Sequence, residues 1–231
     1  MVEPWIDPKF TKNESIFLKR VTAVRKQLSF NVNEREVLDA ANSAVPMPNE
    51  EVESQLTDDE IDQLAFYDHD TGTYNFRYLI RTFYREVKRS TRYKRELSIL
   101  IVSLDRFLEI GSEHGVLVID QLISAASEKL IATCRSDLDM IGRYAEGSFL
   151  ILLPETSAEQ ALAVAERIKQ SLQSITITYR WQEIKVTASI GIANFPQHGD
   201  NIESLIAHAD LCAERLSSEG GNGFRSKLYS I

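Results

Sequence analysis

Acidic side chains stand at two chain positions where an apolar run meets a turn, and such places often carry chemistry. Asp105 directly follows the apolar run from Leu97 to Leu104, and Glu146 precedes the run from Phe149 to Leu153. Magnesium requires hard oxygen ligands, normally carboxylates, and paired metal ions can activate a hydroxyl for attack on a phosphate. Asp105 and Glu146 are therefore the first candidates for a metal site that supports phosphoryl chemistry.

The other metal-ligating residue types show no useful grouping. Histidines occur at His69, His114, His198 and His208, and cysteines at Cys134 and Cys212. None has the short paired spacing of a zinc or haem site, so we expect no metal and no cofactor. The two cysteines are expected to be buried free thiols in a reducing cytoplasm.

Composition narrows the class of protein. The chain has 231 residues, of which 43% are hydrophobic and 26% charged, with a formal net charge of -8. These values are typical of a soluble globular protein, and the negative charge argues against nucleic acid or anionic membranes as partners. No apolar run approaches the roughly 20 residues of a membrane span, and the N-terminus lacks the pattern of a signal peptide. We therefore expect a cytoplasmic protein.

The chain divides near residue 60 into an N-terminal extension, residues 1–60, and a domain, residues 61–231. In the extension, four apolar residues at four-three-four spacing fall on one helical stripe: Phe17, Val21, Val24 and Leu28. The stripe is shorter than two heptads, so docking onto a partner protein and formation of a homodimer both remain open. Pro46 and Pro48 end any helix, and an acidic linker follows as far as Glu60.

The pattern of the domain alternates between strands and helices. A helix is expected around residues 76–87, because its apolar residues share one face, and a capping box at Thr156 and Glu159 opens another helix. The remaining elements are a strand at 97–104, a helix at 114–134, strands at 140–145 and 148–153, strands at 175–179 and 184–193, and a helix at 202–216. This βαββαβ order predicts an α/β fold with a ferredoxin-like core, in which helices flank a mixed sheet.

Four segments, in order and at consistent intervals, resemble one known family. They are Asp68-x-x-Thr71-Gly72-x-x-Asn75, the run from Arg143 to Phe149 with its strand to Pro154, the strand from Val186 to Ala193, and the closing residues Leu205, Ala209, Asp210, Gly220 and Asn222. Together they resemble the GGDEF family, bacterial diguanylate cyclases that join two GTP molecules into cyclic di-GMP. The resemblance covers roughly residues 65–224 and implies a nucleotide-cyclase-like fold.

The resemblance fails at the positions that would do the reaction. Members of the family hold two magnesium ions with carboxylates that correspond to Ser103 and Gly147 here, and a second acid of the signature corresponds to Ser148. Each lost contact to a transition state costs on the order of a hundredfold in rate. Glu146 lies one position before the ligand position, and side chains alternate along a strand, so we expect it to point elsewhere. The resemblance therefore implies a catalytically inactive domain.

Two remnants of ligand sites are implied by the same resemblance. Asp105 and Asp120 mark a vestigial nucleotide pocket, in which Asp120 corresponds to the aspartate that binds guanine. An inhibitory cyclic di-GMP site of the form Arg-x-x-Asp precedes the signature, and Asp139 occupies its aspartate position. The arginine position holds Ser136, with Arg135 one residue earlier, and Arg167 matches a further arginine of that site. Arg135 is either a ligand contact or a solvated cation at a helix end.

Two functions follow as hypotheses. The first is a regulatory or scaffolding protein in bacterial signalling, which acts on a signalling or localisation partner through protein contacts. The second is a receptor for cyclic di-GMP, or another nucleotide, that uses the remnant inhibitory site.

Overall fold

The computed structural model describes residues 65–228 of the chain. The Phe17–Leu28 stripe and the boundary near residue 60 lie outside this range. The described elements are the helices α5 (Phe76–Tyr93), α6 (Phe107–His114), α7 (Val116–Thr133), α8 (Ala158–Gln173) and α9 (Ile202–Ser218), and the strands β1 (Leu97–Leu104), β2 (Met140–Ala145), β3 (Ser148–Pro154), β4 (Thr176–Tyr179), β5 (Gln182–Lys185), β6 (Ala188–Phe195) and β7 (Gly223–Arg225).

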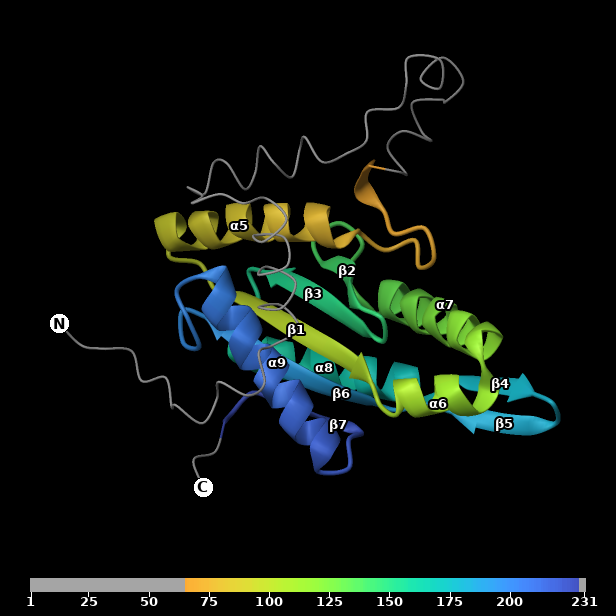
Figure 1. Cartoon of the computed structure of the whole chain (residues 1–231). Helices are drawn as coiled ribbons and strands as arrows, with labels where there is room; N and C mark the ends of the chain where they lie inside the picture. Colours follow the sequence, from red (N-terminus) through yellow and green to blue (C-terminus); the bar gives the residue numbers. More distant parts are fainter. Residues whose placement is uncertain (1–64, 229–231) are drawn as a thin grey trace, which may run out of the picture. The chain divides into compact units, whose positions relative to one another are not determined.

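Five strands form the main sheet in the order β2-β3-β1-β6-β7 (Figure 1). β1 pairs antiparallel with β3 and β6, and β6 pairs parallel with β7. As the central strand, β1 is buried along almost its whole length, which its unbroken apolar sequence favours. The predicted mixed sheet with flanking helices is confirmed.

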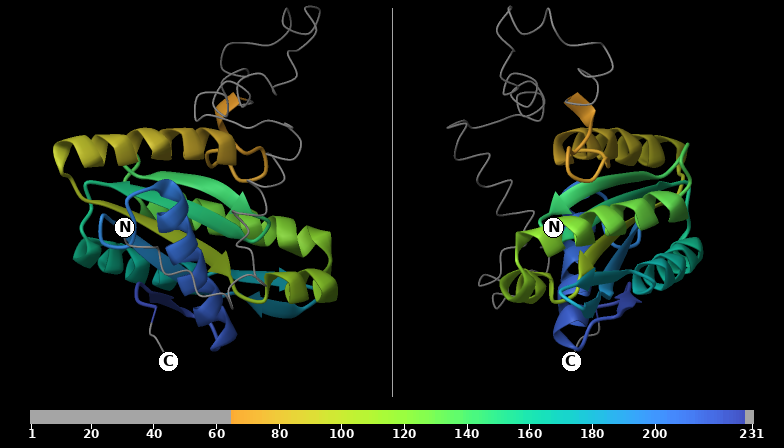
Figure 2. Two further views of the ribbon diagram at one scale, coloured as in Figure 1. Left: turned by 60° about the vertical axis from the view of Figure 1, so that its left-hand side comes forward. Right: turned by 90° about the vertical axis from the view of Figure 1, so that its right-hand side faces the viewer.

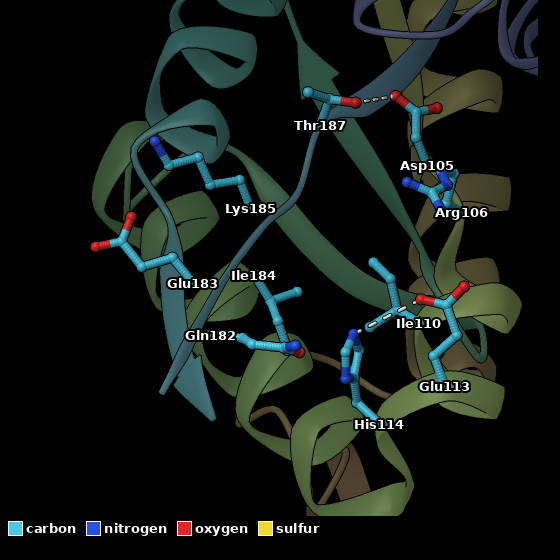
Figure 3. A pocket seen from close by; sticks show the side chains of 10 residues that line it. All are labelled: Asp105, Arg106, Ile110, Glu113, His114, Gln182, Glu183, Ile184, Lys185 and Thr187. Carbon is cyan, nitrogen blue, oxygen red and sulfur yellow. Dashed lines mark hydrogen bonds and ion pairs between the residues drawn. The ribbon is translucent and has the colours of Figure 1, made fainter. Parts of the chain in front are cut away.

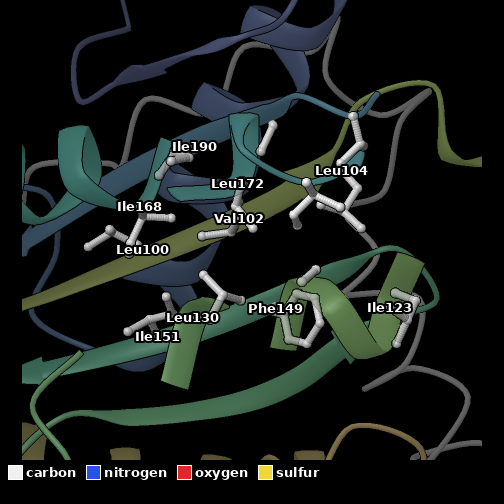
Figure 4. Packing of buried hydrophobic residues seen from close by; sticks show 14 of the residues in the cluster. Leu100, Val102, Leu104, Ile123, Leu130, Phe149, Ile151, Ile168, Leu172 and Ile190 are labelled. Carbon is white, nitrogen blue, oxygen red and sulfur yellow. The ribbon is translucent and has the colours of Figure 1, made fainter. Parts of the chain in front are cut away.

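Helices cover both faces of the sheet. α8 and α9 lie on opposite sides of the strands, as the turned views show (Figure 2). On the α8 side, alternate residues of β1, Leu100 and Val102, join one core with Ile168 and Leu172 of α8 and with residues of α7 (Figure 4). α9 crosses β6 so closely that a Cβ atom at Gly191 would lie 1.8 Å from the carbonyl oxygen of Ala209. A glycine is required there for that close approach.

Helix starts follow local capping chemistry. The Asn75 side chain accepts a hydrogen bond from the Tyr78 amide and begins α5, as its place in the opening motif indicates. The capping box of α8 was predicted one residue too early. Ser157 caps the helix and pairs with Gln160, whereas Thr156 is buried and donates to the Pro154 carbonyl. Both residues are good helix caps, so sequence alone does not separate them.

Two element predictions were wrong. The helix predicted to begin at His114 is preceded by a separate helix, α6, and Gly115, at a φ of 85°, lies between α6 and α7. The strand predicted at 184–193 is two strands, because the chain leaves the β4–β5 hairpin and enters the main sheet at Ala188. The intervening Thr187 carbonyl accepts a hydrogen bond from the Asp105 amide, a contact that an apolar pattern does not reveal.

Both cysteines are free thiols, as expected, but only Cys212 is buried as the composition predicted. Cys134 is half-buried. Burial raises the pKa of Cys134 to about 12 and that of Cys212 to about 11, so both are unreactive thiols near neutral pH. Across residues 65–228, no helix combines the length and the hydropathy that crossing a bilayer requires.

Candidate functional site

The end of β1 meets the β2–β3 hairpin, as the resemblance implies for the reaction centre. The sheet register places Ser103 opposite Ser148, and their Oγ atoms are 3.0 Å apart, within hydrogen-bonding distance. The two positions thus hold short hydroxyls that satisfy each other. Neutral hydroxyls supply none of the negative charge with which carboxylates bind magnesium.

Gly147, in the turn of that hairpin, lies directly against the ring of Phe107. A Cβ atom at position 147 would lie 2.5 Å from Cγ of Phe107 and 3.0 Å from its Cβ. The Gly147 carbonyl accepts a hydrogen bond from the Leu104 amide, which holds the turn against the end of β1. Phe107 is buried, so its ring cannot swing freely away. A side chain at position 147 would therefore require Phe107 to shift.

Asp105 is a structural anchor rather than a free carboxylate. It is 9% exposed and accepts hydrogen bonds from the hydroxyls of Thr187 and Ser189, both at 2.6 Å, and from the Asn222 amide at 2.9 Å. These donors come from the entry into β6, from β6 itself and from the turn before β7. Asp105 therefore joins three segments that are distant in sequence, and its oxygens are already engaged.

A cavity of about 600 Å³ opens between α6 and the β4–β5 hairpin (Figure 3). Asp105 and Thr187 lie at one end, and His114 packs edge-on against Tyr179 at a centroid distance of 6.4 Å. The remaining lining residues are Arg106, Ile110, Glu113, Gln182, Glu183, Ile184 and Lys185. Asp120 is exposed on α7 and is not one of the lining residues, so the two aspartates predicted to share a pocket do not line this cavity together.

The residues of the predicted cyclic di-GMP site come together beside the end of α7. Arg135 binds Asp139 through Nη2 at 2.6 Å and Nε at 3.1 Å, and its backbone amide donates to the same carboxylate. Arg135 Nη2 also reaches the Thr156 hydroxyl at 3.0 Å, and Arg167 Nη2 lies 3.4 Å from the Thr133 carbonyl. The Arg135 side chain is still 47% exposed, whereas that of Asp139 is fully buried. Arg135 is thus an ion-paired residue, and not the solvated cation of the simpler interpretation.

No group of three or more histidine, cysteine, aspartate or glutamate side chains able to hold a metal occurs among residues 65–228. The hairpin turn is held instead by Arg143, whose Nη2 donates to the Glu146 carbonyl at 2.6 Å and whose Nε donates to the Ala145 carbonyl at 3.0 Å. The signature arginine therefore stabilises the turn through backbone contacts.

Several residues that shape this region were not singled out from sequence. Phe107 fills the space beside Gly147, and Thr187 and Ser189 hold Asp105. Phe107 follows Asp105 by two positions, and this spacing does not reveal its contact with the hairpin. The alternation of Thr187 and Ser189 with apolar residues signals a polar contact on one face of the strand.

Comparison with known proteins finds relatives in sequence and in fold. Diguanylate cyclase A of Treponema denticola is 28% identical over 218 residues, which are 93% of this chain and 57% of that protein. The diguanylate cyclase SiaD of Pseudomonas aeruginosa, solved in complex with its activator SiaC, gives a TM-score of 0.66 at 22% identity over 91% of this chain and 77% of that one. The GGDEF domain of DgcB from Caulobacter crescentus, solved with c-di-GMP, gives a TM-score of 0.65 at 18% identity. The match covers 70% of this chain and 93% of that one. The two structures show a common fold.

The fold is that of a nucleotide-cyclase-type domain. The sequence model for "Diguanylate cyclase, GGDEF domain" matches residues 65–223. This chain belongs to the GGDEF family, whose domains occur in proteins of cyclic di-GMP signalling. The chain spans 57% of the length of the Treponema relative.

Proposed function

We propose that this protein is a non-catalytic member of the GGDEF family that regulates or scaffolds cyclic di-GMP signalling through protein contacts in the bacterial cytoplasm. The observation that carries the proposal is the packing around the hairpin turn. Ser103 and Gly147 occupy the positions that the resemblance assigns to metal carboxylates, and Phe107 fills the space beside Gly147. Charged contacts to metal and phosphate dominate catalysis of phosphoryl transfer, so their replacement removes the largest contribution to the rate.

A cyclase assay tests this proposal directly. Purified full-length protein is incubated with GTP and Mg²⁺ or Mn²⁺, and cyclic di-GMP is measured by chromatography, with the Treponema relative as positive control. We expect turnover at least about a hundredfold below that of the control. Cyclic di-GMP formation at a comparable rate would refute the proposal. The variant Ser103→Asp with Gly147→Asp is also expected to stay inactive, because the second carboxylate would have to displace the buried Phe107 ring.

Protein contact is proposed to involve the apolar stripe of the N-terminal extension, with Val21 and Val24 at its centre. SiaD was solved with a protein activator, so a relative of this fold does bind a protein. The variant Val21→Asp with Val24→Asp places two charges in an apolar contact and should abolish co-purification of a partner. Thr22→Asp with Ala23→Asp adds the same charge off the stripe and serves as the control. If both variants captured the partner protein equally, the contact would lie outside the apolar stripe.

A second candidate function is a cyclic di-GMP receptor, and it is favoured by the grouping of Arg135, Asp139 and Arg167. Arginine presents paired donors that match the acceptor edge of guanine, and part of the Arg135 guanidinium remains exposed. The domain of DgcB was solved with c-di-GMP, which shows that a related domain takes this ligand. The ion pair between Arg135 and Asp139 argues against this candidate, because both carboxylate oxygens of Asp139 already accept hydrogen bonds from Arg135.

Titration calorimetry with cyclic di-GMP separates the two functions. Arg167→Ala is the cleaner test variant, because Arg135→Ala would also leave the buried Asp139 carboxylate without its partner. Saturable binding that Arg167→Ala weakens would establish the receptor function. Absence of heat up to high micromolar ligand, with cyclic di-GMP, GTP and GDP alike, would exclude it and leave the protein-contact function.

A further inference from the structure

The tip of the β4–β5 hairpin is built from residues that its turn disfavours. Arg180 and Trp181 are the two turn residues between Tyr179 and Gln182, and their φ angles are 48° and 67°. A two-residue turn with two positive φ angles is normally Asn-Gly or Asp-Gly, because side chains with a Cβ atom crowd the backbone in this conformation. A bulky residue there is strained, and strain of this kind is retained where the residue has a task.

Trp181 has no packing role that would explain its place. Its side chain is 100% exposed, although tryptophan is a residue that folding normally buries. Beside it, the Arg180 guanidinium lies 5.1 Å from the centroid of the Tyr179 ring. The hairpin therefore carries a large apolar side chain and a cation together at its tip. Figure 1 shows the β4–β5 hairpin at one end of the described domain.

The cavity between this hairpin and α6 complements that tip. Ile110 and Ile184 contribute apolar surface to it, and Glu113 lies on its α6 side (Figure 3). Glu113 is a mostly exposed carboxylate that lies 3.7 Å from Nε2 of the His114 imidazole. The other lining residues are polar or charged, so the cavity offers the body of an indole two isoleucines and its N–H several acceptors. Glu113 at the edge can meet a cation that accompanies the indole.

We propose that a second copy of this chain docks at this end of the molecule, with the Trp181 side chain of each copy entering the cavity of the other and Arg180 meeting Glu113. The tip and the cavity share the β4–β5 hairpin, so one twofold rotation brings both tips to both cavities. A twofold interface requires such a self-complementary patch. Arg180 and Glu113 have opposite charges, so each copy offers the charge that the other lacks. This contact goes beyond the proposed function and does not depend on the catalytic state.

The available area determines how strong the dimer can be. A tryptophan buries about 150–250 Å², so two symmetric insertions supply roughly 300–500 Å². The neighbouring α6–α7 corner adds two exposed apolar residues, Val116 at 73% and Leu117 at 69% exposure. A stable interface needs about 1,200–2,000 Å² in total, so the area of this contact lies below that range. We therefore expect a weak dimer that forms in the micromolar concentration range.

Sedimentation velocity of the full-length chain, from low to high micromolar concentration, measures this association. We expect the variant Arg180→Asn with Trp181→Gly to weaken it at least about 30-fold, as loss of a tryptophan hot spot does. The same variant has a favoured hairpin turn, so circular dichroism should show an intact fold. Tyr93→Ala removes another exposed aromatic, at the end of α5, and should leave association unchanged. A monomer at every concentration, or equal association of variant and wild type, would overturn the proposal.

A charge exchange identifies the second copy as the occupant. Arg180→Glu places two acids against each other in the dimer, and Glu113→Arg places two cations together, so each variant alone should be monomeric. In an equal mixture, the altered tip of one variant meets the altered cavity of the other, and the dimer should return. Failure of the mixture to associate would show that Arg180 and Glu113 do not face each other.

Discussion

Replacing Asp105 by alanine removes the acceptor at which three separate chain segments meet. In the native protein the carboxylate accepts hydrogen bonds from Thr187, Ser189 and Asn222 at 2.6–2.9 Å, and it is almost fully buried. A hydrogen bond to a charged group contributes about 1.5–3 kcal/mol, and a buried donor left without a partner costs about 1–3 kcal/mol. Thr187 is only half-buried, so water can replace part of its loss. We expect Asp105→Ala to lower the free energy of unfolding by about 3–5 kcal/mol.

Urea denaturation followed by far-ultraviolet circular dichroism measures this loss. Tryptophan fluorescence is a poor probe of the core, because Trp181 is fully exposed and Trp5 lies outside the described residues. Asp120→Ala is the matched control, since it removes an exposed carboxylate from helix α7 and should change stability by no more than about 0.5 kcal/mol. If the free energy of unfolding of Asp105→Ala stayed within about 1 kcal/mol of the wild-type value, Asp105 would not anchor the three segments. A ligand-binding role for Asp105 would then be the better explanation.

Three further predictions use the same denaturation assay. Gly147→Ala should cost about 1–3 kcal/mol, because its methyl group overlaps Phe107, and a neutral effect would contradict the proposed lack of space. Arg180→Asn with Trp181→Gly should raise stability by about 1 kcal/mol by relieving the strained turn, and a loss would show that the native tip is not strained. Burial lowers the pKa of His198 to about 4, so on acidification the unfolded chain takes up this proton first and stability falls from about pH 6.5 towards pH 4. The His198 ring is half-exposed, so solvent reduces the size of this effect. Between pH 7 and pH 5, the free energy of unfolding of His198→Gln should fall by about 1 kcal/mol less than that of the wild type. An equal fall in both proteins would refute this assignment.

The sequence by itself determined the class of fold and the residue types at the positions that the resemblance assigns to the reaction centre. Periodicity located the central strand at Leu97–Leu104 and the hairpin that turns at Glu146-Gly147, and both are confirmed. These features depend on the local alternation of apolar and polar residues, which a single chain displays directly. The replacement of acids by Ser103 and Gly147 is likewise a matter of residue type. Whether the loss of those acids abolishes catalysis stays a prediction.

Only the tertiary structure decided which side chains fill the space those acids would need. Phe107 lies 40 positions before Gly147, and Thr187 lies 82 positions after Asp105, so neither contact follows from local spacing. Such contacts depend on the register of β1 with β3 and β6 and on where the chain leaves one sheet for another. The same register makes Ser103 and Ser148 partners. A one-dimensional pattern specifies which face a residue takes, but packing alone selects the neighbour that it meets.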